Sequence, residues 1–135
     1  MNTELILSSL DCERLETLLD STPKNLIQNL ATLQYKLANA TYVKPEEMPN
    51  DRVSMNSMVE FSLSPSGKHF NLTLVYPREA TDIQSTLSVF SPIGTALLGA
   101  RLGETLSTGL GSDEPHNITL HHIHYQPERD GHLHR

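Results

Sequence analysis

The sequence has a single cysteine, Cys12, and no tryptophan among its 135 residues. One cysteine excludes an intramolecular disulfide and a cysteine-rich zinc module, and it fits a cytosolic protein. Long apolar runs are also missing, so we expect no membrane-spanning helix. Residues 1–10 lack the basic and apolar regions of a secretory signal. Together these absences predict a cytoplasmic protein.

Basic residues are scarce. The chain has 10 Lys and Arg against 16 Asp and Glu, a formal net charge of −6. Binding to duplex DNA depends on neutralising many phosphates with Lys and Arg, so we expect weak or no direct nucleic-acid binding. The sequence also lacks a G-x-S-x-G nucleophile motif, an H-E-x-x-H zinc motif and a phosphate-binding P-loop. We therefore expect no cofactor and no catalytic residues.

The composition changes near residue 44. Leucines at helical spacing precede it, and short strand-like runs separated by turn residues follow it. The length suits one compact domain with a small appendage. This pattern predicts a helical part over residues 1–44, a connector over 45–51, a main domain over 52–127 and a flexible tail over 128–135.

Two short helices are predicted in the first part. Cys12, Leu15 and Leu19 form one apolar stripe of a helix over residues 10–20, with Ser8 or Ser9 as its cap. We expect the Cys12 thiol to be buried and structural. Pro23 suits the first turn of a second helix, whose heptad seam consists of Leu26, Leu30, Leu33 and Leu37. Two such helices predict a short antiparallel hairpin of the coiled-coil type.

An α+β domain with a mostly antiparallel sheet is predicted for the second part. A phase slip near Asn56 indicates a bulge or break in its first strand. Residues 92–99 are predicted to form a short helix between the third and fourth strands, and this helix is expected to cover one face of the sheet. The predicted strands lie within residues 53–63, 69–77, 86–91, 106–110 and 116–126.

Histidines are the most conspicuous candidates for a metal site. On a strand, His122 and His124 share one face and His121 lies on the other. Two ligands on one face, with further histidines at 116, 132 and 134, are too few for an ordered zinc site. We therefore interpret them as solvent-facing and expect no metal.

The stretch "SPIGTALLG" has the signals of a capped helix. Ser91 is a natural N-cap, Pro92 fits the first helical position, and Gly99 suits the left-handed position after the helix. Local physical chemistry explains these residues as a compact helix and assigns them no further role.

Several strings in order resemble the carboxy-terminal domain of the GreA/GreB transcript-cleavage factors: "SMNSMVEF", "LVYP", "LSVFSPIGTALLGARLGE" and "ITLHHIHYQ". The resemblance covers residues 51–126 and implies an FKBP-like fold. The cleavage factors carry a long coiled coil with an acidic pair at its tip, which holds the catalytic magnesium. Here the hairpin is roughly a third to a half as long, and the acidic pair is missing. The chain is therefore most similar to the short-armed members, the regulators of nucleoside diphosphate kinase.

The resemblance implies a non-enzymatic regulator that binds RNA polymerase near its secondary channel and competes with the cleavage factors. An effect on nucleoside diphosphate kinase levels would then be indirect. Ser91 and Pro92 match the family's docking motif, and Ile93 and Ala96 are weaker candidates on the same helix. Phe90 stands where the cleavage factors often have Asp or Asn, which suggests a more apolar contact.

Three alternatives stay open. An active cleavage factor is opposed by the short reach of the hairpin. A prolyl isomerase, suggested by the FKBP-like fold, needs an apolar pocket that three Phe and four Tyr hardly supply. Direct regulation of a kinase has no nucleotide-binding motif to support it.

Overall fold

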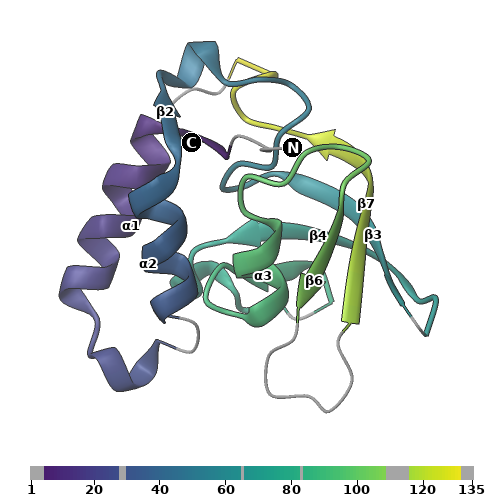
Figure 1. Ribbon diagram of the computed structural model, residues 1–135, viewed down its shortest axis with the longest axis horizontal. Coiled ribbons are helices and arrows are strands. Elements are labelled where there is room, and N and C mark those ends of the chain that lie inside the picture. Colours follow the sequence, from purple (N-terminus) through teal and green to yellow (C-terminus); the bar gives the residue numbers. More distant parts are fainter. Residues whose placement is uncertain (1–4, 28–29, 65, 83, 109–115, 132–135) are drawn as a thin grey trace.

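The computed structural model describes residues 5–27, 30–64, 66–82, 84–108 and 116–131. Figure 1 shows the helices α1 and α2 beside a mixed α/β body. The amino-terminal elements are β1 (Ile6–Ser8), α1 (Ser9–Ser21), the 3-10 turn η1 (Lys24–Leu26), α2 (Leu30–Asn39), β2 (Thr41–Val43) and η2 (Pro45–Glu47). The elements that follow are β3 (Met58–Ser64), β4 (His69–Val75), η3 (Pro77–Glu79), β5 (Thr86–Ser88), α3 (Pro92–Leu97), β6 (Thr105–Thr108) and β7 (His116–Tyr125).

A five-stranded sheet has the strand order β5-β4-β3-β7-β6. All neighbours are antiparallel except β4 and β5, which run parallel. The helix α3 lies in the chain between β5 and β6. The prediction of a mixed fold is confirmed, and the described residues of this region contain the five strands and the one inserted helix that the sequence predicted. The FKBP-like description stays a prediction.

In the view of Figure 1, α1 and α2 lie next to one another, and η1 lies between them in the chain. The antiparallel hairpin of the coiled-coil type stays a prediction. The Ser8 side chain accepts a hydrogen bond from the Asp11 amide and caps α1, as expected. The second helix is shorter than predicted. After Pro23 the chain makes the η1 turn, and the described part of the helix, α2, spans Leu30–Asn39. No helix among the described residues is long and apolar enough to cross a membrane.

One hydrophobic cluster joins the helices to the sheet. Leu15 of α1 and Leu33 of α2 are fully buried in the same cluster as Phe61 of β3 and Leu74 of β4. Cys12 is also in this cluster, and burial raises the pKa of its thiol. The helices therefore pack on the sheet and share its core, and the proposed division into domains stays a prediction.

The break predicted near Asn56 is confirmed, but the predicted start of the strand at Val53 was wrong. The five residues before β3 form a buried turn, and β3 begins only at Met58. Asn56 has a φ of +67°, a left-handed conformation that Asn tolerates better than most residues. Its backbone amide donates to the Leu74 carbonyl at 2.6 Å, so the turn is bound to the end of β4.

The sequence did not predict the small parallel pair β1–β2, in which Ile6 lies opposite Thr41. Each strand has only three residues, too few to show a period of two.

Of the proposed tail, residues 128–131 form a turn in which the Asp130 amide donates to the Gln126 carbonyl. The rest of that tail, including His132 and His134, lies outside the described residues.

Candidate functional site

The amino-terminal end of α3 is fixed by side-chain hydrogen bonds. The Ser91 hydroxyl accepts from the Gly94 amide at 3.0 Å and donates to the Ser88 carbonyl at 2.7 Å. The hydroxyl of buried Thr95 donates to the Val89 carbonyl at 2.6 Å. Ser91 is the N-cap and Pro92 the first helical residue, as the sequence predicted.

Gly94 is required by packing. A Cβ atom at this position would lie 2.0 Å from the backbone oxygen of Ser88, far inside van der Waals contact. The absence of a side chain therefore lets α3 pack directly on the end of β5. Gly99, with a φ of +80°, follows the helix in the left-handed conformation that the sequence predicted.

We call Phe90–Ala96, the candidate contact segment from the sequence, the docking segment. The sequence suggested that Phe90 makes an apolar contact with a partner. Phe90 is only 8% exposed, however, and lies in the hydrophobic cluster. Ser91, Pro92, Ile93 and Ala96 are half-buried and form the accessible part of the segment. An apolar contact made by an exposed Phe90 ring is thus not supported by this conformation.

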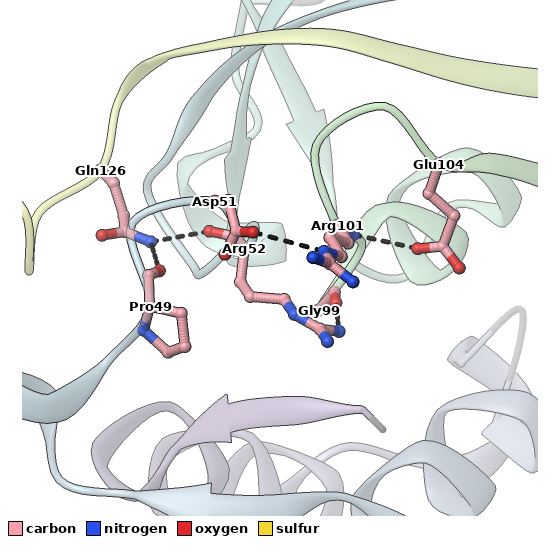
Figure 2. A network of polar contacts seen from close by, with 7 residues as sticks. All are labelled: Pro49, Asp51, Arg52, Gly99, Arg101, Glu104 and Gln126. Carbon is pink, nitrogen blue, oxygen red and sulfur yellow. Dashed lines mark hydrogen bonds and ion pairs between the residues drawn. The ribbon is translucent and has the colours of Figure 1, made fainter. Parts of the chain in front are cut away.

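The carboxyl-terminal end of α3 is bound by two cations from other parts of the chain. The Lys36 ammonium of α2 donates to the carbonyls of Ala96 at 3.0 Å and Leu98 at 2.8 Å. The guanidinium of Arg52 donates to the Gly99 carbonyl at 3.2 Å (Figure 2). The last carbonyls of a helix have no partner within the helix, so Lys36 satisfies such a group at Ala96. Arg52 binds the chain at Gly99, just after the helix.

Gln126 holds the connector next to this end of the helix. Its fully buried amide donates to the backbone carbonyls of Pro49 at 2.8 Å and Arg52 at 2.7 Å, as Figure 2 shows. In the same view Arg101 lies 3.4 Å from the carboxylate of Asp51. This ion pair is largely exposed and adds little stability, so the buried amide is the stronger link.

Asp11 links α1 to the turn before β3. It is 2% exposed, and its Oδ2 atom accepts from the Met55 amide at 3.0 Å. Burial raises the pKa of the Asp11 carboxyl to about 7. The Met55 hydrogen bond and Arg14 oppose this shift, and the Glu128 carboxylate adds to it.

The prediction that His121 lies on the opposite face from His122 and His124 was wrong. His121 Nε2 lies 2.8 Å from Ser62 Oγ, and His124 Nε2 lies 3.1 Å from Glu60 Oε1. Glu60 and Ser62 alternate along β3 and so share one face. A register shift between β3 and β7 at this point turns His121 to the same side.

Among the described residues no three His, Cys, Asp or Glu side chains are grouped to hold a metal ion.

A cavity of about 740 Å³ lies between α1 and the β4–β5 edge of the sheet. Tyr76 is the one aromatic residue among those that line it, and Arg14 and Glu79 bring opposite charges to it. The other lining residues are Asn56, Met58, Asn71, Thr73, Val75, Ser85 and Thr86. A wall with one aromatic residue and two charged side chains differs from the aromatic pocket that prolyl isomerisation would need.

Comparison with known proteins gives a family. Residues 48–125 match the family described as "Transcription elongation factor, GreA/GreB, C-term". The chain belongs to the GreA/GreB family. The matched range contains the docking segment and all five strands of the large sheet, in agreement with the resemblance seen in the sequence.

Relatives of this GreA/GreB-family chain differ in how much of their length they share with it. The "Regulator of nucleoside diphosphate kinase" of Escherichia coli is 37% identical over 94% of this chain and 93% of its own. The "Transcription elongation factor GreA" of Caldanaerobacter subterraneus is 36% identical over 58% of this chain and 50% of its own. A solved GreA/GreB elongation factor from Nitrosomonas europaea has a TM-score of 0.74 at 34% identity, covering 92% of this chain and all of that one.

The likeness to the nucleoside diphosphate kinase regulator therefore includes the amino-terminal helices, as the sequence predicted. Family membership supports a regulator of the transcription-factor type. Sequence reasoning missed the roles of Lys36, Asp11 and Gln126, because each acts on backbone groups of a distant segment.

Proposed function

We propose that this protein is a non-enzymatic regulator that binds RNA polymerase near the secondary channel and competes there with the GreA/GreB cleavage factors. Binding uses the accessible residues of the docking segment, Ser91, Pro92, Ile93 and Ala96. The observation that carries the proposal is the combination of this family motif on a rigidly capped helix with two short amino-terminal helices.

The length of the helices supports binding without cleavage. The 13 residues of α1 and the 10 residues of α2 correspond to about 20 Å and about 15 Å. Between the helices, residues 22–29 contain one charged side chain, Lys24, and no carboxylate, so Asp20 in the last turn of α1 is a single acid and not a pair. An arm of this length without an acidic tip does not deliver a metal-binding pair to a distant active site.

An influence on nucleoside diphosphate kinase is proposed to be indirect, through transcription. The described residues contain no phosphate-binding loop of the P-loop type, and the full-length relative is named as a regulator. The protein would thus change kinase levels rather than kinase turnover.

The experiment is a competition assay with core RNA polymerase and a fluorescently labelled cleavage factor. The unlabelled protein should displace the labelled factor and should slow transcript cleavage in stalled complexes without cleaving RNA itself. Absence of displacement contradicts the proposal, and magnesium-dependent RNA shortening by the protein alone favours the alternative of an active cleavage factor.

A matched pair of proline variants locates the contact. Pro92 and Pro77 each occupy a first-turn position, in α3 and in η3 respectively. Pro92→Ala should weaken displacement, whereas Pro77→Ala, outside the docking segment, should leave it unchanged. Equal effects of both substitutions would exclude the docking segment as the specific contact.

A further inference from the structure

Lys36 connects α2 to α3 across 60 residues of sequence. Its Nζ atom donates to the Ala96 and Leu98 carbonyls at 3.0 and 2.8 Å. A cation at the carboxyl-terminal end of a helix satisfies orphan carbonyls and interacts favourably with the helix dipole. Ala96 is itself part of the docking segment, so the contact reaches the segment directly.

The helix α3 has only six residues. A helix of this length is not stable alone, and its orientation depends on contacts with the rest of the protein. At its carboxyl end the Leu97 carbonyl is bound by the Ala100 amide and the Gly99 carbonyl by Arg52. Lys36 binds two further carbonyls of this turn, those of Ala96 and Leu98.

The position of Lys36 has an energetic cost that its contacts offset. Burial lowers the pKa of the Lys36 ammonium to about 8, while the Glu104 carboxylate acts in the opposite direction. A buried ammonium is tolerated where it is well hydrogen-bonded. Two short bonds to helix carbonyls meet this condition.

We propose that Lys36 is a positioning residue of the docking segment: from α2 it fixes the carboxyl end of α3 and thereby the orientation of Pro92, Ile93 and Ala96. The inference rests on the proposed function. In this proposal the amino-terminal helices have a role other than reaching into the channel, because they hold the docking segment in position.

Three variants test this role. Lys36→Met keeps an apolar stem but removes the ammonium, and Lys36→Arg keeps a cationic donor. Val59→Ala is the control, because it truncates a fully buried side chain of β3 and lowers stability without removing a hydrogen bond to α3. Below the melting temperature of all variants, Lys36→Met should bind core RNA polymerase about tenfold more weakly. Lys36→Arg should recover most of the affinity, and Val59→Ala should bind like the wild type.

Hydrogen exchange of the free protein gives a second readout that does not depend on polymerase. The Leu98 and Ala100 amides donate to the Gly94 and Leu97 carbonyls and report on the end of α3. They should exchange faster in Lys36→Met than in Val59→Ala. If Lys36→Met does not fold, Lys36→Gln, which retains an uncharged donor, takes its place and should show an intermediate effect.

The outcomes separate the two proposals. Unchanged exchange at Leu98 and Ala100, or faster exchange with unchanged affinity, overturns the positioning role of Lys36 and leaves the proposed function standing. A wild-type protein that does not bind polymerase overturns the proposed function and with it the docking role of Lys36. Faster exchange in that case shows that the lysine acts on the fold alone.

Discussion

The Asp11 carboxylate accepts a hydrogen bond from the Met55 amide at 3.0 Å, which joins the first turn of α1 to the buried turn before β3. The carboxyl group is almost completely removed from solvent, and burial raises its pKa from 3.8 to about 7. The groups that act on it are Ser8, Arg14, Met55 and Glu128.

This contact predicts a pH-dependent stability. Between about pH 4 and about pH 7 the folded protein keeps the Asp11 proton and the unfolded chain releases it. The free energy of unfolding should therefore fall as pH rises through this range and level off above it. The change attributable to Asp11 should be roughly 3 kcal/mol.

Asp11→Asn isolates that contribution, because the amide oxygen still accepts from Met55 but no longer titrates. In urea unfolding, the wild type should have a clearly lower free energy of unfolding near pH 8 than near pH 5. The variant should show a smaller decrease and should be the more stable protein at the higher pH. Parallel pH profiles for the two proteins would show that Asp11 is not the titrating group.

Gly94→Ala should destabilise the protein because the new methyl group meets the Ser88 carbonyl. Overpacking against the backbone of β5 should cost about 3 kcal/mol. Gly67→Ala is the control: its φ is +76°, but nothing lies within 4 Å of a Cβ there, so only backbone strain of about 1 kcal/mol is expected. Chemical denaturation of both variants measures the difference, and equal losses would contradict the packing at Gly94.

Gln126→Leu should remove the two buried donors that bind the Pro49 and Arg52 carbonyls. Leaving these acceptors unpaired should cost roughly 3 kcal/mol. Gln84, which is exposed, provides the control Gln84→Leu, with an expected change below about 0.5 kcal/mol. Thermal unfolding distinguishes the two, and a small loss for Gln126→Leu would mean that water replaces the amide.

The start and the end of α3 could be predicted from the sequence. Ser91, Pro92 and Gly99 act on their immediate neighbours, so residue type and spacing are enough to place the cap, the first turn and the end of the helix. The same holds for Ser8 at the start of α1. The resemblance to the GreA/GreB family added the expected docking role of Ser91 and Pro92, which physical chemistry alone did not supply.

Other features depend on contacts that spacing does not encode. Lys36 and Asp11 each bind backbone groups more than 40 residues away. His121 changes face because of a register shift against β3, which a single strand does not reveal. Phe90 is buried because the chain turns into α3 directly after β5, although its place before the motif suggested an exposed contact.

Displacement of a labelled cleavage factor from core RNA polymerase tests the central claim most directly. With the wild-type protein we predict complete displacement at saturation and no RNA cleavage, and with Pro92→Ala we predict displacement only at higher concentration. Simultaneous binding of both proteins, or no binding of this one, would contradict the account.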